Sequence, residues 1–388
     1  MIFDISGKEK NIYSNLYGDG ITDDSYALQH LIDSNSSIVI PNGLTVRLTR
    51  TININISKLK MFDGGNSVFL VDGSFPAFRV YGTNAGSADP STQTNDVLEK
   101  EAGFIFKNAI IIGNNKYNAV TFDNSTGIVV ENCFGITITN CYITQVRDGI
   151  VVSGMNRNII FSDNNIYNLT GCGIKYDNTV NLHQHNVVGN MMQYCKYCVM
   201  IDGSKQIANF HFTGNDIEIS TYPNADFLAQ RCVYIEAGDT ESGQLSEIVF
   251  SGNTIQGHSK SNCIVEIKGG ANRPIKFITF TGNHVSNTKQ TLISLEKVIN
   301  ATITGNTFYT DNSLSGTYAI DLKNCNVVSV GSNSCHDMSY LVKTSNGTKC
   351  VSIIGNALYV FSDKALEATE AVDSIIEHNN AIEPYLAN

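Results

Sequence analysis

Five short stretches that end in the same dipeptide decide the fold of this chain: HFTGN at 211–215, VFSGN at 249–253, TFTGN at 279–283, TITGN at 302–306 and SIIGN at 352–356. In each stretch, polar and apolar residues largely alternate up to a Gly-Asn turn. Further copies end at Asn114, Asn140, Asn164, Asn190, Asn333 and Asn379. The copies recur about every 25 residues, and such a repeat predicts a solenoid in which each copy forms one coil.

A second strand precedes the turn in most repeats; examples are CVMID at 198–202, CVYIE at 232–236 and LISLE at 292–296. Apolar residues alternate along these segments with the period of a strand, and no stripe of helical period accompanies them. Leucine-rich repeats have a similar period but need a Leu/Asn consensus that is absent here. We therefore expect an all-β, single-stranded parallel β-helix of about a dozen coils, spaced about 4.8 Å apart.

The Gly-Asn dipeptide is interpreted as part of the architecture. We expect its asparagine to adopt the left-handed backbone of a sharp corner. We also expect the side-chain amide to hydrogen-bond to the asparagines of the coils above and below. A ladder of this kind would hold the coils together and leave any chemistry to the outer surface.

The composition argues against several classes of function. Charged residues make up 16% of the chain, the formal net charge is −10 and no long run of Lys and Arg occurs, so nucleic-acid binding is not expected. No apolar stretch is long enough to span a membrane. The start, MIFDISGKEK, lacks the apolar core of a signal peptide. Without one, the ten cysteines are expected to be free thiols, and the Cys195–Cys198 pair has no partner pair at metal spacing.

The N-terminal part follows a different pattern. The segment YGDGITDDSYALQHLID at 17–33 predicts a turn and a short amphipathic helix, and SIVIPNGLTVRL at 37–48 and MFDGGN at 61–66 follow it. This series resembles the N-terminal signature of the pectate-lyase-like superfamily of right-handed parallel β-helices. That superfamily is common in bacteriophage tailspikes and tail fibres and in secreted polysaccharide enzymes. The resemblance implies a right-handed solenoid with a capping segment over 1–60, which includes the helix, and the β-helix over 61–388.

Counting back from the Gly-Asn turns aligns acidic residues at the ends of the second strands. Inward positions such as Val233 and Ile235 are apolar, so the acids are expected to point outward. The aligned acids are Asp177, Asp202, Glu236, Glu266 and Glu296. Like charges on adjacent coils repel, so such a column suggests raised pKa values, a function or a compensating divalent cation. No other cofactor and no protein metal ligand set is expected. Alternatively, the acids begin turns and are simply solvated.

Two pairs in this column are candidates for catalysis, Asp177 with Asp202 and Asp202 with Glu236. Carboxylates on adjacent coils would lie about 5 Å apart, near the separation found in retaining glycosidases. One would act as the acid and the other as nucleophile or base. Lys175 and Tyr234 lie two residues before the acids and, with Glu266, are candidates for substrate binding; alternatively they only pair or stack.

The longest repeat carries two insertions beside this column. STYPNADFLAQR at 220–231 precedes the strand, and AGDTESGQ at 237–244 follows it. Long loops on a rigid scaffold commonly carry binding, so Tyr222, Asp226 and Arg231 are candidate walls of a glycan groove. His183 and His185 are assigned to a turn after the previous strand, and a metal site is not expected there.

The resemblance also tests for known catalytic groups. Polygalacturonase-type relatives carry Asn-Thr-Asp-Gly, Asp-Asp and Gly-His-Gly on successive coils. Only Asp148 and Gly149 match the first of these, and the following coils read GCGI at 171–174 and YCVM at 197–200. An Asp-Gly pair is also an ordinary turn. The acidic column with Lys175 is compatible with a lyase but does not identify one, so catalysis stays open.

The resemblance implies a bacteriophage tail spike or fibre module that binds a bacterial surface polymer and, in one version, depolymerises it. The polymer would be capsule, exopolysaccharide or teichoic acid. The alternatives are a free polysaccharide lyase or hydrolase, and a structural or receptor-binding fibre without catalysis. The phage interpretation implies a homotrimer in the virion tail, contacts with other tail or baseplate proteins, and assembly in the host cytoplasm.

Overall fold

A computed structural model of the chain describes residues 16–83, 99–115, 123–203, 205–219, 230–239, 243, 245–310, 316–360, 365–368 and 375–384. It confirms the expected fold: an all-β, right-handed parallel solenoid of about 12 turns with one helix among the described residues. The residues group into two compact units, 1–175 with 179–191, and 176–178 with 192–388. The sequence-based boundary at residue 60 stays a prediction.

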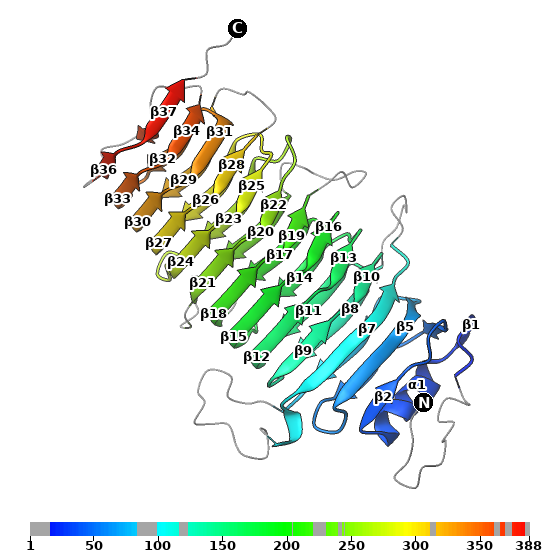
Figure 1. The fold of residues 1–388 in the computed structure, drawn as a ribbon. Helices are drawn as coiled ribbons and strands as arrows, with labels where there is room; N and C mark the ends of the chain where they lie inside the picture. The colour runs from blue at the N-terminus through cyan, green and yellow to red at the C-terminus, as the bar shows by residue number, and fades with distance from the viewer. Residues whose placement is uncertain are drawn as a thin grey trace. The chain divides into compact units, whose positions relative to one another are not determined.

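The first unit stacks its strands in parallel, with the edges of each coil formed by short strands (Figure 1). One sheet contains β4 (Ile52–Asn55), β6 (Pro76–Tyr81), β8 (Thr126–Glu131), β11 (Asp148–Ser153) and β14 (Cys172–Tyr176). The other contains β1 (Asp19–Asp23), β2 (Ser37–Val39), β3 (Thr45–Leu48), β5 (Met61–Val71), β7 (Phe104–Ile112), β9 (Ile136–Thr139), β10 (Tyr142–Thr144), β12 (Met155–Ser162), β13 (Asn165–Tyr167) and β15 (Asn181–Val188). β16 (Met191–Gln193) begins at the last residue of this unit.

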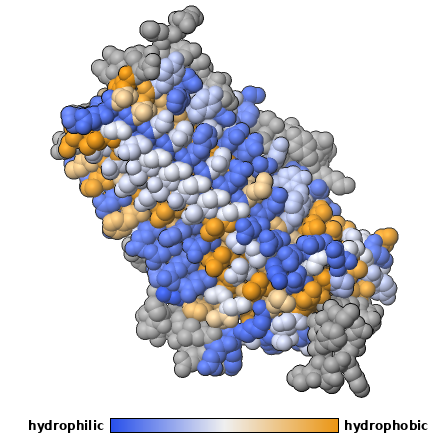
Figure 2. All heavy atoms as spheres, in the orientation of Figure 1, coloured by the Kyte–Doolittle hydropathy of each residue, from blue (hydrophilic) through white to orange (hydrophobic). Residues whose placement is uncertain are grey.

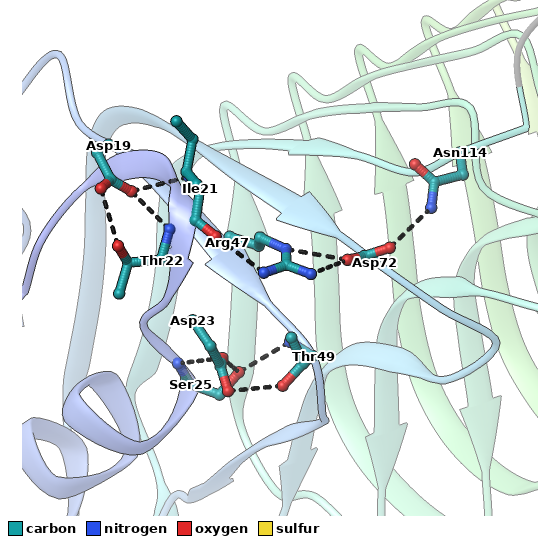
Figure 3. Close-up of polar contacts among 9 residues, drawn as sticks. All are labelled: Asp19, Ile21, Thr22, Asp23, Ser25, Arg47, Thr49, Asp72 and Asn114. Atoms are coloured by element: carbon teal, nitrogen blue, oxygen red, sulfur yellow. Dashed lines mark hydrogen bonds and ion pairs between the residues drawn. The ribbon is translucent and has the colours of Figure 1, made fainter.

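The expected capping helix is α1 (Ser25–Ser34), and the acidic residues of the N-terminal motif fold its approach (Figure 3). The carboxylate of Asp19 accepts hydrogen bonds from the backbone N–H groups of Ile21 at 2.8 Å and Thr22 at 2.7 Å. Asp23 accepts hydrogen bonds from the backbone N–H of Ser25 at 3.0 Å and from its hydroxyl at 2.6 Å. These Asx-type turns explain why the motif contains Asp at these positions. Its carboxylates are therefore structural.

Longer contacts tie this turn to the first strands (Figure 3). The guanidinium of Arg47 on β3 donates to the backbone carbonyl of Ile21 at 2.8 Å and pairs with Asp72 at 2.5 Å. The MFDGGN motif also has an architectural role, because Gly65 lies in β5 with a φ of 59°. A Cβ atom at this position would lie 1.8 Å from the backbone carbonyl oxygen of Ile40. Only glycine allows that approach.

The second unit repeats a three-strand coil seven times, and each column is parallel (Figure 1). The sheet that continues the second-strand series contains β17 (Tyr197–Asp202), β20 (Arg231–Glu236), β23 (Cys263–Lys268), β26 (Thr291–Glu296), β29 (Tyr318–Lys323), β32 (Tyr340–Ser345) and β35 (Leu366–Ala368). The long strands are β18 (Gln206–Thr213), β21 (Leu245–Ser251), β24 (Ile275–Thr281), β27 (Val298–Thr304), β30 (Asn326–Gly331), β33 (Lys349–Ile354) and β36 (Ile375–His378). The third strands are β19 (Asp216–Glu218), β22 (Thr254–Gln256), β25 (His284–Ser286), β28 (Thr307–Tyr309), β31 (Ser334–Met338), β34 (Ala357–Val360) and β37 (Ala381–Pro384).

The interior of the second unit is a stack of inward side chains, because alternate residues of every strand face the axis. The rings of Phe250 and Phe280, on adjacent long strands, stack with centroids 4.7 Å apart and an interplanar angle of 7°. Phe212 lies on the other side of Phe250, at 5.6 Å between centroids. All ten cysteines are free, and nine of them are buried. Cysteine therefore serves as a small apolar packing residue in this fold.

The predicted asparagine ladder is present and buried. In the second unit it runs through Asn215, Asn253, Asn283, Asn306, Asn333, Asn356 and Asn380. The side-chain amide of Asn283 donates to Oδ1 of Asn306 at 2.9 Å and to the carbonyl of Phe250 at 2.9 Å. The last member is Asn380, because Asn379 occupies the preceding position of the turn, with a φ of 55°.

One expectation about this turn is wrong. The left-handed residue is the glycine, for example Gly282 with a φ of 64°, whereas Asn283 is not among the residues with positive φ. Glycine pays no steric penalty there, so the asparagine keeps an ordinary backbone and contributes only its amide. In the first unit, Asn140 takes the left-handed place with a φ of 52°. Cys141 then stands in the ladder and donates its N–H to Asn164 at 3.0 Å.

Figure 2 shows a face that is mainly hydrophilic or neutral, with hydrophobic residues scattered over it. Exposed apolar side chains of the first unit include Ile105, Ile160 and Val188. Scattered residues of this kind are normal for a soluble surface. Across the described ranges, no helix has the length and hydropathy needed to cross a membrane.

Candidate functional site

The outward side of the sheet from β17 to β35 in the second unit, called here the β17–β35 face, carries the predicted acids. Asp202 pairs in register with Glu236, so this candidate pair does lie on adjacent coils. Glu236, however, pairs with Lys268, and Lys268 pairs with Glu296. The next partner of Glu296 is Lys323. Beyond Asp202 the column therefore alternates in sign, and neighbouring coils attract each other.

The predicted all-acid column is thus wrong, and the error has a simple cause. Residues 237–244 join β20 to β21, whereas only residues 269–274 join β23 to β24. Counting back from the Gly-Asn turn across connections of unequal length aligned Glu266 with Glu236. Glu266 pairs with Tyr234 and Ser294 instead, two residues away and on the same face. A shift by two residues conserves the side of the strand but changes the column.

The displacement brings Glu266 into an ion-pair network. Its carboxylate lies 2.6 Å from Nε of Arg231 and 2.8 Å from Nζ of Lys268. The side chains of Glu266 and Arg231 are each only 14% exposed. Burial acts to raise the pKa of Glu266, but the hydrogen bond from Lys268 and the charge of Arg231 outweigh it, and the pKa lies below its ordinary value. Glu266 is therefore an ionised acceptor that also positions two cations.

Two tyrosines lie beside this network. The rings of Tyr197 and Tyr234 are 5.6 Å apart between centroids, with an interplanar angle of 41°. The Tyr234 hydroxyl donates to Glu236, and Nζ of Lys268 lies 5.5 Å from the Tyr234 ring centroid. Burial raises the pKa of Tyr234, and the hydrogen bond and charge of Glu236 raise it further, so the phenol stays protonated and donates. The Tyr234 cluster is defined here as Tyr197, Arg231, Tyr234, Glu236, Glu266 and Lys268.

The cluster has the composition of a ligand site for a polyhydroxylated molecule. It presents partly exposed aromatic rings next to carboxylates that accept hydrogen bonds and cations that donate them. Pockets and grooves for small molecules commonly combine apolar rings with a few fixed polar groups. Three of the predicted binding residues, Arg231, Tyr234 and Glu266, are brought together here.

The remaining predicted residues occupy separate positions. Lys175 is half-buried on β14, between the buried Ile174 and Tyr176, and it closes the first unit. Asp177 follows Tyr176 directly and belongs to the second unit, where it is half-exposed. Asp202, at the end of β17, is exposed. Tyr222 and Asp226 lie outside the described residues.

The structure gives no charge argument for a divalent cation at this face, because Lys268 and Lys323 interrupt the column. No group of three or more His, Cys, Asp or Glu that could hold a metal occurs in the described parts of the chain. His183 and His185 lie within strand β15, and their assignment to a turn is wrong. Burial lowers the pKa of His185 to about 3, so it is a neutral core residue packed on Phe161.

Asp148 has a structural explanation. It is 7% exposed, and its carboxylate accepts a hydrogen bond from the backbone N–H of Cys172 on the next coil at 2.8 Å. A Cβ atom at Gly171 would lie 2.4 Å from the same carboxylate. The partial match to the polygalacturonase motif therefore marks a turn that is stitched to its neighbour.

A second group of charged and aromatic residues lies further along the same face and was missed by sequence reasoning. The Asp321 cluster consists of Tyr318, Asp321, Lys323, Tyr340, Lys343 and Glu367. The rings of Tyr318 and Tyr340, on adjacent coils, stack at 5.9 Å with an interplanar angle of 12°. A signal was available, since both β29 and β32 begin with Tyr and carry Lys two residues beyond an inward apolar position.

Comparison with known proteins supports the fold. Residues 64–230 match a family model described as NosD, periplasmic copper-binding protein, which covers less than half of the chain. A search of curated protein sequences gave no match. The described residues of the matched segment do not fit a copper site, because they contain no group of three or more metal-ligating side chains.

Solved structures resemble the whole chain. The A-module of the mannuronan C-5 epimerase AlgE6 of Azotobacter vinelandii has a TM-score of 0.69 at 14% identity, with 97% of this chain and 100% of that chain covered. A mutant tailspike protein of the E. coli bacteriophage HK620, in complex with a pentasaccharide, has a TM-score of 0.57 at 14% identity, covering 98% and 79%. Pre-mature gene product 12 of bacteriophage phi29 has a TM-score of 0.66 at 13% identity, and the alignment covers 96% of this chain but 52% of that one. The parallel β-helix fold is shared with phage tailspikes and with glycan-active enzymes.

Proposed function

We propose that this protein is a bacteriophage tail spike or fibre module that binds a bacterial surface polymer on the β17–β35 face. The observation that carries the proposal is the Tyr234 cluster, in which two rings 5.6 Å apart lie beside Glu236, Glu266, Arg231 and Lys268. The complex of a structurally similar tailspike with a pentasaccharide supports a glycan as the ligand. The polymer would be capsule, exopolysaccharide or teichoic acid.

The proposal extends to the context of the protein. As a tail component it would reside in the virion, contact other tail or baseplate proteins, form a homotrimer and be assembled in the host cytoplasm. The alternative, a free polysaccharide lyase or hydrolase, is supported by the structural similarity to an epimerase module and to a GH87 α-1,3-glucanase.

Binding is tested with purified capsular polysaccharide, exopolysaccharide and wall teichoic acid from candidate hosts, and with whole cells. We expect one polymer to bind. Tyr234→Ala removes a ring and the donor to Glu236, and should weaken binding by at least roughly tenfold, as loss of a central aromatic contact does. The matched control is Glu247→Gln, which removes an exposed carboxylate on β21, away from this face. Equal binding by wild type and Tyr234→Ala would contradict the proposed surface.

A depolymerase activity is a second candidate, favoured by the register of Asp202 with Glu236 on adjacent coils. In this version Asp177 is a further candidate catalytic residue, paired with Asp202, and its role stays a prediction. New reducing ends would report hydrolysis, released phosphomonoester would report phosphodiester cleavage, and absorbance of unsaturated products would report elimination. Loss of a general acid or base costs about 10²–10⁴ in rate, so Asp202→Asn should abolish the signal. Binding without turnover on any polymer would leave a non-catalytic, receptor-binding fibre.

A further inference from the structure

The Asp321 cluster contains two buried carboxylate oxygens without a hydrogen-bond donor. Asp321 is 7% exposed, and its Oδ2 lies 2.9 Å from Nζ of Lys323, but its Oδ1 has no partner. Glu367, two coils further on in the same column, accepts a hydrogen bond from Tyr318, and its Oε2 likewise has none. A buried carboxylate oxygen without a donor is costly, so two in one column indicate that an external group supplies the donors.

The residues around these oxygens define the chemistry of that group. Lys343 separates Asp321 from Glu367 in the column, and its Nζ lies 4.6 Å from the Tyr318 ring centroid. The half-buried Tyr340 extends the aromatic surface beside Tyr318. Two carboxylates face two lysines, Lys323 and Lys343, so the formal charge of the cluster is zero. No cation is in surplus to attract a phosphate or carboxylate group.

We propose that the Asp321 cluster is a second glycan subsite, and that it takes a neutral, hydroxyl-rich sugar residue. Hydroxyl groups of the sugar donate to Oδ1 of Asp321 and Oε2 of Glu367, and an apolar face of the sugar ring lies against Tyr340. The ammonium groups of Lys323 and Lys343 donate to ring or hydroxyl oxygens. This inference rests on the proposed glycan binding and narrows the substrate class from surface polymers in general to neutral ones.

The two clusters lie on one face, three coils apart, since β23 and β26 separate β20 from β29. At about 4.8 Å per coil, this is a separation of roughly 14 Å along the stack. A linear glycan that runs along the stack could therefore contact both. The outward positions between them on β26 are the small residues Thr291 and Ser294, which leave that path unobstructed by large side chains.

The test compares neutral with anionic probes by calorimetry. Dextran, mannan and a neutral O-antigen polysaccharide are the neutral probes; polygalacturonate and poly(glycerol phosphate) are the anionic ones. We expect at least one neutral probe to bind, with an affinity that changes less than about twofold between low and high salt, because screening weakens only charge-driven binding. Tighter, salt-sensitive binding of either anionic probe would overturn the proposal.

Variants identify the subsite. Asp321→Asn and Glu367→Gln each replace an acceptor with a group that donates, and each should weaken binding of the neutral probe by roughly tenfold to a hundredfold. Tyr340→Ala should also weaken it. Glu247→Gln is the control, and unchanged thermal midpoints establish that the variants are folded. If Asp321→Asn fails to fold, Glu367→Gln and Tyr340→Ala decide, because both residues are only half-buried.

The outcomes separate this inference from the proposed function. If no probe of either kind binds, the inference is wrong and the proposed function fails with it. If a neutral probe binds, and binding is lost in Tyr234→Ala but unchanged in Asp321→Asn and Glu367→Gln, the proposed function survives and the second subsite does not. Loss of affinity in all three variants, with Glu247→Gln unaffected, supports both.

Discussion

At Glu266, one largely buried carboxylate is held between two cations. Its oxygens lie 2.6 Å from Arg231 and 2.8 Å from Lys268, and the latter side chain is 34% exposed. Arg231 cannot lose its proton, so removal of its partner would leave a charge in a poorly solvated place. The stabilising value of this group therefore lies in keeping a binding surface fixed, since all three side chains belong to the Tyr234 cluster.

Glu266→Gln should destabilise the protein by about 3 kcal/mol at pH 7, because breaking a buried ion pair leaves Arg231 uncompensated. The folded-state pKa of Glu266 lies below its model value of 4.5, so the ionised form stabilises the fold fully above that pH. This contribution is lost as the pH falls through the lower, folded-state pKa. Urea unfolding of wild type and variant at several pH values measures the difference.

The control for this measurement is again Glu247→Gln, which should change stability by less than about 0.5 kcal/mol at any pH. The difference between wild type and Glu266→Gln should shrink as the pH is lowered below about 4.5. A difference that is the same at pH 7 and at pH 3.5 would contradict the assigned role of the ionised carboxylate.

At the scale of the element, the Gly-Asn turn divides its work between two residues. Gly282 takes the left-handed backbone, and Asn283 supplies the amide that joins the coils. The ladder was predictable because every repeat has the same dipeptide in the same place. The role of glycine was misassigned because glycine and asparagine both tolerate positive φ, and only the backbone angles distinguish them.

Asn283→Ala should lower the free energy of unfolding by at least about 3 kcal/mol, since buried groups that lose a partner cost about 1–3 kcal/mol each. The amide of Asn253 would lose its acceptor, and the carbonyl of Phe250 would lose its donor. Thermal and urea unfolding measure the loss. Asn326→Ala, at an exposed position on β30, is the control and should be nearly neutral; similar midpoints for the two variants would argue against a stabilising ladder.

At the scale of the molecule, the long strands of the second unit present small polar side chains in register. One outward column consists of Thr279, Thr302, Ser329 and Ser352. A pale, nearly neutral band covers this part of the surface in Figure 2. Such a flat surface of low charge can pack against a copy of itself without desolvating ions.

We therefore expect a homotrimer in solution, as the tail-fibre interpretation implies. Light scattering coupled to size exclusion should give three times the chain mass of 42.3 kDa at micromolar concentration. Thr302→Arg adds a charge to the middle of the neutral column and should shift the mass towards the monomer. A wild-type protein that stays monomeric would contradict this prediction.

Prediction from the sequence succeeded where a local pattern repeats and failed where coils differ in length. The helix α1 and the turn before it were predictable, because Asp19 and Asp23 act on residues within three positions of themselves. The histidines of β15 were misassigned to a turn because the polar sequence NLHQHN hides a strand in which Leu182 and His185 are buried. Burial of His185 depends on neighbouring coils, which no local pattern reports.

The sequence by itself determined the coil: alternating strands, a Gly-Asn turn and a repeat of about 25 residues leave a parallel β-helix as the arrangement that buries every apolar face. Only the tertiary structure decided which side chains share a column. The connections between strands differ in length, so the register of one coil on the next is set by backbone pairing and not by distance along the chain. That register placed Lys268 between Glu236 and Glu296, moved Glu266 against Arg231, and aligned Asp321 with Lys343 and Glu367.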